Sequence, residues 1–435
     1  MFFSRPLEAA GWIMEFISSQ IHDGPEIMMS AGPMKISADQ RYEFGSNWQH
    51  FIETQLTPQR LESSRKKLLT LLNRADLRGK TFLDIGSGSG LHSLAAWQSG
   101  ADRVTSFDYD PQSVAATRRL HVLAGSPENW TVMRGDILDP QLCSTISPHD
   151  IVYSWGVLHH TGAMWEAIRN ANRFVAENGL FCIALYTSDA YWNPSTNFWL
   201  VVKQRYNRAG EFERAVMEWW YFWRFIALSE LRHFKNPFRR FQDYYQSRGM
   251  SLWTDIRDWL GGWPMEFAGI METREFCRKE LGLKLDWMSA GEACTEYVFT
   301  RQQDSAVLPT DGAGLQQVHL PGPFSQLKGK AFTCRLPELP TVSGEGLPHL
   351  YSEWVLYEED EPLTFPRAKI RAIEEQGGGR SLIRGETLSF STSDNSDPNT
   401  NGRRYELRRR IGPSLSAPVR EIVFPAEHSF SHQSR

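Results

Sequence analysis

The sequence predicts an α/β protein with a doubly wound, mostly parallel sheet, an inserted helical cap and a C-terminal β-rich module. Three observations indicate this arrangement. Strand-like apolar runs alternate with helical patterns between about residues 76 and 301, which is typical of a parallel sheet with crossover helices. An aromatic-rich stretch at 190–275 interrupts the alternation. Beyond residue 302, Pro, Gly, Ser and Thr become more frequent and helical periodicity fades.

Length and composition describe a globular protein of two or three domains. The chain has 435 residues, of which 41% are hydrophobic and 23% charged. A net charge of −4 argues against a dedicated nucleic-acid binder, which tends to be basic. The five cysteines are scattered and never in CxxC, which predicts reduced thiols without a disulfide framework or zinc site. No signal-peptide core or membrane-length apolar window is found, so we expect a cytoplasmic protein.

The elements can be placed in order along the chain. Residues 1–75 form an N-terminal segment and helical lid, in which Thr57-Pro58 predicts an N-cap followed by proline at the first helical position. We expect a final strand pair in the segment 283–299. The other predicted strands are 81–85, 103–107, 130–134, 150–154 and 180–186, and the helices between them are 91–99, 111–124 and 163–176.

The most informative stretch is Phe82-Leu83-Asp84-Ile85-Gly86-Ser87-Gly88-Ser89-Gly90. It predicts a buried strand, a glycine-rich turn and a helix from about Leu91. Glycine lets the backbone adopt positive φ and approach a ligand closely. The N–H groups at the start of the following helix face the turn. This is the arrangement of a nucleotide-binding βα unit.

A carboxylate follows at the end of the next strand. Asp108 lies 22 positions after Gly86, close to the ~20-residue spacing at which an acid reaches a ribose diol. The turn has the pattern D-x-G-x-G-x-G, which matches neither the dinucleotide fingerprint G-x-G-x-x-G nor the phosphate P-loop.

The sequence resembles the class I S-adenosylmethionine (SAM)-dependent methyltransferases over roughly residues 40–301. The resemblance implies a Rossmann-like methyltransferase fold, S-adenosyl-L-methionine as cofactor and a methyltransferase domain at 76–301, followed by an unrecognised module at 302–435. Four motifs carry it, each at a predicted strand end: Leu83-Asp84-Ile85-Gly86-Ser87-Gly88-Ser89-Gly90, Asp108, Gly135-Asp136-Ile137 and Tyr153-Ser154-Trp155-Gly156-Val157-Leu158-His159-His160.

The resemblance implies roles for the residues around the turn. Asp84 would meet the ammonium group of SAM, and Asp108, with Tyr109 beside it, would bind the ribose. The alternative for Asp108 is a helix N-cap, although Asp110 suits that position better. The methionine part of SAM would pack against the turn residues Gly86, Ser87, Gly88 and Gly90.

Three further positions complete the implied cofactor site. Asp136 would accept a hydrogen bond from the adenine amino group, and Ile137 would pack on the ring. Asp136 could instead close an Asx-turn at the strand end. Trp155 would wall the adenine or the substrate, with a core position as the alternative.

Methyl transfer from a sulfonium is an in-line displacement, so the nucleophile must be held near the methyl group and, if it is a hydroxyl, deprotonated. His159 and His160 follow the fourth strand, and imidazole is the usual base near neutral pH. Alternatively, His159 packs inward while His160 caps the next helix. Tyr186, at the end of the fifth strand, would orient a hydroxyl.

We predict O-methylation of a small molecule, a sugar or a lipid-linked intermediate. The Asn/Asp-Pro-Pro-Tyr motif of N-methylating enzymes is missing, and Ser154-Trp155-Gly156-Val157 stands in its place. The aromatic insertion would form the substrate wall, a cap that buries its own core, or an interfacial helix at 218–228 that meets a membrane.

The C-terminal module is expected to contain strands at 352–357, 387–390 and 404–411. The oxygen-rich run Asp394, Asp397, Asn399 and Asn401 predicts a hydrogen-bonded turn rather than a calcium site, because its spacing is not that of an EF-hand. No metal is expected. The arginines at 403–410 predict a solvated strand edge, with a phosphate- or sugar-facing patch as the alternative.

Two rival functions remain open. The first is a non-catalytic scaffold in which a SAM-type fold supports a ligand-binding C-terminal module. The second is an enzyme that uses SAM or its decarboxylated form for another transfer, which would release methylthioadenosine.

Overall fold

The computed structural model describes residues 42, 44–190, 194–232, 236, 252–290, 294–301, 314–337, 354–363, 365–366, 368–412 and 418–422. The N-terminal segment before Tyr42 lies outside these residues, as do Tyr191 and the aromatic run from Phe234 to Tyr245.

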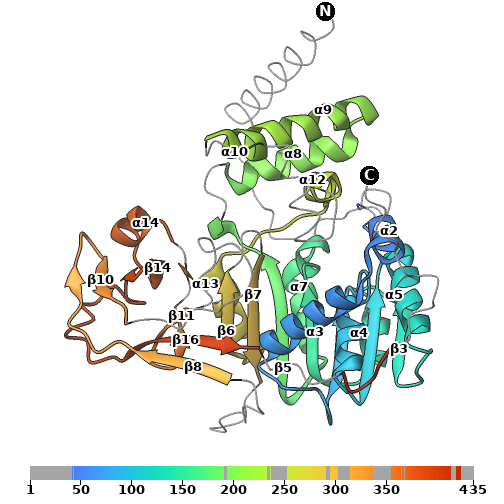
Figure 1. Ribbon diagram of the computed structural model, residues 1–435, viewed down its shortest axis with the longest axis horizontal. Helices are drawn as coiled ribbons and strands as arrows, with labels where there is room; N and C mark the ends of the chain where they lie inside the picture. The colour runs from blue at the N-terminus through green and yellow to red at the C-terminus, as the bar shows by residue number, and fades with distance from the viewer. Residues whose placement is uncertain are drawn as a thin grey trace, which may run out of the picture.

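A seven-stranded sheet forms the centre of the protein (Figure 1). Its order is β3-β2-β1-β4-β5-β7-β6, in which β7 runs antiparallel to both neighbours and the other pairs are parallel. The predicted doubly wound, mostly parallel sheet is therefore confirmed. The strand order reverses between β1 and β4, which is where such sheets bind ligands. The strands are β1 (Thr81–Ile85), β2 (Arg103–Asp108), β3 (Trp130–Arg134), β4 (His149–Trp155), β5 (Val175–Tyr186), β6 (Lys284–Ala290) and β7 (Cys294–Thr300).

The start of β5 differs from the prediction. We expected a helix over 163–176 and a strand from residue 180, whereas the helix ends at Asn172 and the strand begins at Val175. Val175 already pairs with His149, and the register then shifts so that Leu180 pairs with Ile151. Asn178 has a φ of +57°, a conformation typical of turns, and it lies within the strand where the register shifts.

Helices cover both faces of the sheet. Helices α3 (Pro58–Leu72), α4 (Leu91–Gln98) and α5 (Pro111–Leu123) pack on one face, and α7 (Met164–Asn172) and α13 (Ile270–Leu281) pack on the other. The other helical elements around the sheet are α2 (Gly45–Gln55), α6 (Pro140–Thr145), η2 (Leu158–His160) and η3 (Ser188–Ala190).

Two predicted helix starts are confirmed. The Thr57 side chain accepts a hydrogen bond from the Arg60 amide (3.3 Å), with Pro58 as the first residue of α3. Asp110 caps α5 by accepting from the Gln112 amide (2.9 Å). Asp110 therefore fills the capping role that was the alternative for Asp108.

The cap follows β5 and precedes α13. Figure 1 shows its helices stacked above one end of the sheet. They are α8 (Thr196–Arg208), α9 (Glu211–Tyr221), a π-helical segment η4 (Phe222–Ala227), α10 (Leu228–Arg232) and α12 (Leu252–Gly261). The cap buries its own aromatic core, which includes Trp199, Tyr206, Trp220 and Phe222. None of the described helices combines the length and apolarity needed to cross a bilayer.

The described residues of the C-terminal module form two further sheets, so the predicted β-rich character is confirmed. One has the order β13-β14-β15-β10-β9 and the other β12-β11-β16-β8. We missed several short elements, and the strand expected at 352–357 is displaced to Val355–Glu358. The elements are β8 (Gly314–His319), β9 (Ser325–Gln326), β10 (Phe332–Arg335), β11 (Val355–Glu358), β12 (Glu361–Pro362), β13 (Phe365–Pro366), α14 (Ile370–Glu375), β14 (Arg380–Arg384), β15 (Thr387–Phe390) and β16 (Tyr405–Ile411).

This module docks against the edge of the large sheet. Val355 and Tyr357 belong to the same buried cluster as Trp287 of β6, and the Tyr357 hydroxyl donates to the Asp286 carbonyl (2.9 Å). Arg410 of β16 reaches across to α3, where it donates to the Leu71 carbonyl. The exact boundaries proposed for the N-terminal segment, the methyltransferase domain and the module remain predictions.

Candidate functional site

The glycine turn connects β1 to α4 at the carboxyl end of the sheet. Gly86, Gly88 and Gly90 have φ values of +74°, +53° and +79°, which L side chains rarely adopt. A Cβ on Gly90 would lie 2.9 Å from the Thr117 backbone, and one on Gly88 would lie 3.2 Å from the Trp48 indole nitrogen. The turn therefore depends on glycine, and α2 lies close over it.

Asp108 ends β2 with its carboxylate on the turn. Its Oδ2 accepts from the Gly88 amide and its Oδ1 from the Asp110 amide, both at 2.9 Å. Burial raises the pKa of Asp108 to about 6, although both backbone hydrogen bonds oppose the rise. Each carboxylate oxygen has more than one lone pair, so Asp108 can accept further hydrogen bonds such as those of two hydroxyl groups.

Asp84 is buried behind the turn. Its Oδ2 accepts from the Ser93 hydroxyl (2.5 Å), which in turn accepts from Ser106 (2.8 Å). Trp130 donates to the same Ser106 hydroxyl (2.8 Å). Burial raises the pKa of Asp84 to about 7. In this structure Asp84 ties β1 to α4, and its contact with the SAM ammonium remains a proposal.

The end of β3 carries the implied adenine site. Asp136 Oδ1 accepts from the Leu138 amide (2.9 Å), which is the Asx-turn that was the alternative reading. Ile137 is buried, and its carbonyl accepts from the Asn170 side chain (3.0 Å). Tyr109 follows Asp108, and the Arg134 guanidinium lies 5.9 Å from its ring centroid.

Trp155 lies at the end of β4. It is 44% exposed, so the core alternative does not describe it. Its indole donates to Glu296 of β7 (2.8 Å), and its ring is 6.5 Å from that of His92. The exposed face of this indole is a surface on which a flat ligand could stack.

His159, His160 and Tyr186 come together beneath the cap. The Tyr186 ring lies 4.5 Å from His159 and 5.9 Å from His160. His159 is fully buried, which agrees with the alternative expectation that it packs inward. His160 Nδ1 hydrogen-bonds the Pro264 carbonyl (2.7 Å) rather than capping α7. Since a carbonyl only accepts, Nδ1 carries the proton and Nε2 carries the lone pair.

Both imidazoles are neutral at physiological pH. Burial lowers the pKa of His160 to about 4 and that of His159 well below its usual value. Lys203 of the cap contributes to both effects as a nearby positive charge. Both rings therefore keep a lone pair at neutral pH, but the burial that keeps them neutral also disfavours the imidazolium that proton uptake would form.

Sequence reasoning missed two ionisable residues of the cap, Lys203 on α8 and Asp258 on α12. Asp258 Oδ1 accepts from the Tyr42 hydroxyl (3.2 Å) and the Asn47 side chain (2.5 Å). The Tyr42 amide also donates to the Trp263 carbonyl (2.9 Å). These bonds join Tyr42 and helix α2 to the cap. The only sequence signal is that Lys203 follows an apolar run, Trp199 to Val202.

Asp258 gives a pH-dependent prediction. Burial raises its pKa from 3.8 to about 7, so the folded chain keeps a proton that the unfolded chain loses above about pH 4. The stability that Asp258 contributes is therefore full below pH 4 and is lost as the pH rises to 7. Chemical denaturation should show Asp258→Asn gaining about 2 kcal/mol relative to wild type between pH 4 and 7.5, roughly half the value of the full shift.

Ser63→Ala, at an exposed position whose side chain does not titrate, is the control for this experiment. Its stability difference from wild type should stay constant over the same range. A constant difference for Asp258→Asn as well would mean that Asp258 titrates normally in the folded protein.

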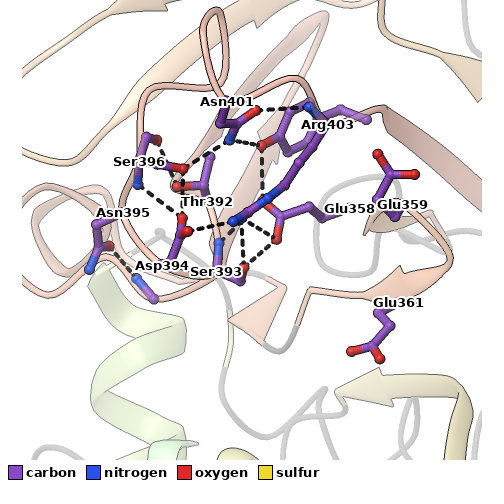
Figure 2. Close-up of polar contacts among 12 residues, drawn as sticks. Glu358, Glu359, Glu361, Thr392, Ser393, Asp394, Asn395, Ser396, Asn401 and Arg403 are labelled. Carbon is purple, nitrogen blue, oxygen red and sulfur yellow. Dashed lines mark hydrogen bonds and ion pairs between the residues drawn. The ribbon is translucent and has the colours of Figure 1, made fainter.

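The acidic run of the C-terminal module forms a hydrogen-bonded turn (Figure 2). Arg403 lies between Asp394 (2.5 Å) and Glu358 (3.2 Å), and Asp394 also accepts from the Ser396 hydroxyl (2.6 Å). Among the described residues no cluster of metal-ligating side chains is found. The carboxylates of Asp394 and Glu358 are neutralised by Arg403, which belongs to the same module.

The arginines that follow are not a solvated edge throughout. Arg404 pairs with Glu359 at the surface, whereas the Arg410 side chain is only 5% exposed and pairs with Asp286 (3.0 Å). The expectation of a solvated edge is therefore wrong for Arg410, because β16 packs against the large sheet.

Comparison with known proteins places the site in a family context. A family model described as a methyltransferase domain matches residues 51–246. Ribosomal protein L11 methyltransferase from Tolumonas auensis is 48% identical over 111 residues, which cover 21% of this chain and 38% of that protein. The chain thus spans well under two thirds of the length of this relative.

Solved structures show more distant similarity. An O-methyltransferase family protein from Burkholderia thailandensis is 13% identical with a TM-score of 0.37, covering 69% of this chain and 72% of that one. Magnesium protoporphyrin IX methyltransferase from Synechocystis is 13% identical with a TM-score of 0.33, covering 56% and 84%.

Proposed function

This chain carries a class I SAM-dependent methyltransferase domain, and from that premise we propose that it transfers the methyl group of SAM to an oxygen atom of a small molecule. The observation that carries the proposal is the position of Asp108. Its carboxylate ends β2 and bonds the Gly88 amide, at the point where the strand order reverses. In this arrangement the acid suits a ribose, and the glycine turn suits the methionine part of SAM that is attached to the ribose.

The donor side of the site would use residues from three strand ends. Asp108 would accept both ribose hydroxyls, and Asp136 would accept from the adenine amino group with its second oxygen. Ile137 and the exposed face of Trp155 would contact the ring, and Tyr109 would flank the ribose. SAM supplies an activated methyl group. The protein then needs only to hold this group in position and to keep water away from it.

The acceptor side is roofed by the cap and the lid. The hydrogen bonds from Tyr42 and Asn47 to Asp258 join the N-terminal segment to α12, and we expect this contact to cover the acceptor. A roof of this kind favours a small acceptor over a protein surface. His160 Nε2 would take the proton of a bound hydroxyl, and Tyr186 would orient that hydroxyl.

A protein acceptor is the second candidate, because the local relative is a ribosomal protein methyltransferase. A membrane-facing role for residues 218–228 has less support. Trp219 and Trp223 are 48% and 43% exposed, but Met217, Trp220 and Phe222 are buried in the cap core.

The test is a transfer assay with methyl-tritiated SAM. Purified protein is incubated with clarified cell extract, and the label is then separated by ultrafiltration into small molecules and macromolecules. Our proposal predicts labelled small molecules. Label confined to protein would favour the second candidate. Binding of S-adenosylhomocysteine (SAH) without any transferred label would favour the scaffold, and methylthioadenosine as product would favour a different transfer.

A further inference from the structure

Lys203 is a buried lysine of the cap helix α8. Lys203 is only 1% exposed. The ammonium donates to the Trp259 carbonyl in the last turn of α12 and lies 4.1 Å from the centroid of the Trp259 ring. An ammonium has three N–H donors, so one carbonyl leaves it short of acceptors.

The described residues place no carboxylate within ion-pairing distance of Lys203. Asp258 is the acid whose charge acts on it, but its carboxylate is committed to Tyr42 and Asn47. Burial lowers the pKa of Lys203 to about 7, because desolvation outweighs this attraction. A buried cation without a counter-ion is costly to the fold and is common at functional sites.

A second unsatisfied group is connected to this lysine through two aromatic rings. His159 is fully buried, and neither of its ring nitrogens has a hydrogen-bond partner among the described residues. Its ring is 4.5 Å from Tyr186, and Tyr186 is 5.4 Å from Trp259, whose ring contacts Lys203. These residues form one contiguous cluster beneath the cap, at the carboxyl ends of β4 and β5.

We propose that Lys203 and His159 bind an anionic oxygen group of the methyl acceptor, so that the acceptor is a small acid rather than a neutral alcohol. An oxyanion would accept the remaining N–H bonds of the ammonium and the N–H of the imidazole, and it would neutralise the buried charge. The surrounding Tyr186 and Trp259 rings would contact the apolar part of such a molecule. This inference rests on the proposed function, and it names the class of acceptor.

A purely structural role makes a different prediction for this lysine. If the ammonium serves to cap the C-terminus of α12, replacing it should destabilise the protein. If it serves to bind an anion, removing an unpaired buried charge should leave the melting temperature unchanged or raise it. Lys203→Met keeps the length and the apolar stem, and Lys328→Met, at an exposed position of the C-terminal module, is the matched control.

The experiment fractionates the acceptor by charge. Small molecules from an extract are separated on an anion exchanger at neutral pH, and retained and unretained fractions are incubated with the full chain and methyl-tritiated SAM. We expect label in products from the retained fraction. Treating that fraction with phosphatase beforehand distinguishes a phosphate, whose label would be lost, from a carboxylate, whose label would persist.

Variants of Lys203 then test whether this residue binds the acceptor. Lys203→Met should slow labelling of the retained acceptor about 100-fold, as expected for removing one member of a buried charge pair. SAH affinity by calorimetry should stay within about twofold, since Lys203 does not contact the donor side, and Lys328→Met should label normally. If Lys203→Met loses SAH binding, Lys203→Gln replaces it, with the same expected loss of labelling.

Three outcomes overturn the inference. Label that arises from the unretained fraction shows a neutral or cationic acceptor. Lys203→Met and Lys203→Gln with undiminished labelling show that the lysine does not bind the acceptor. In both cases methyl transfer itself stands. The absence of label from every fraction, despite SAH binding, instead removes the proposed function and the inference with it.

Discussion

Replacing Asp108 by alanine is expected to weaken SAH binding about 100-fold, which corresponds to about 3 kcal/mol. The carboxylate holds the Gly88 amide in place and is positioned to accept both ribose hydroxyls. The variant therefore loses two charge-assisted bonds to the ligand and the support of the turn. Titration calorimetry with SAH measures the change directly.

Two further variants sharpen this result. Asp108→Asn keeps one acceptor oxygen for the turn but loses the charge, so we expect about a tenfold loss. Glu128→Ala, at an exposed position before β3, should bind SAH as wild type does. Binding by Asp108→Ala within threefold of wild type would show that the acid does not hold the ribose.

The second large effect is expected for Arg410→Ala in the C-terminal module. Arg410 donates to the Leu71 carbonyl, pairs with Asp286 at 3.0 Å and lies 4.6 Å from the centroid of the Trp287 ring. Its loss removes this hydrogen bond between β16 and α3, and it removes a buried side chain that packs on Trp287 of the large sheet. We expect the free energy of unfolding to fall by about 3 kcal/mol.

Arg404→Ala is the matched control for the docking contact. Arg404 precedes the same strand, but its ion pair with Glu359 is exposed, with side-chain exposures of 66% and 46%. Its loss should cost less than about 1 kcal/mol. Equal denaturation midpoints for Arg410→Ala and wild type would mean that the module folds without this contact.

The parallel core could be predicted because local signals and tertiary position agree there. Strands β1 to β4 each end at an acid or directly before a glycine, as at Asp84-Ile85-Gly86 and at Asp108, and the structure places those ends at one edge. The start of β5 was predicted five residues too late, because the strand is irregular there, with Asn178 at positive φ and a shift in register against β4.

The two residues whose burial was not predicted, Lys203 and Arg410, are buried by segments that are distant in the sequence. Lys203 lies on a helix whose charged residues suggest solvent, and it is buried because α12, more than fifty residues later, packs over it. Arg410 belongs to an arginine run that suggests a surface, and it is buried because β16 docks on α3. Neither contact leaves a periodic trace in the sequence, so only the fold reveals them.

The central claim is that the bend between β1 and α4, together with Asp108, receives the methyl donor. A crystal structure of the protein grown with SAH tests this most directly. The account predicts the ribose hydroxyls within hydrogen-bonding distance of both Asp108 oxygens, and the adenine between Ile137 and the end of β4. A ligand bound elsewhere, or an Asp108 carboxylate turned away from the ribose, would contradict it.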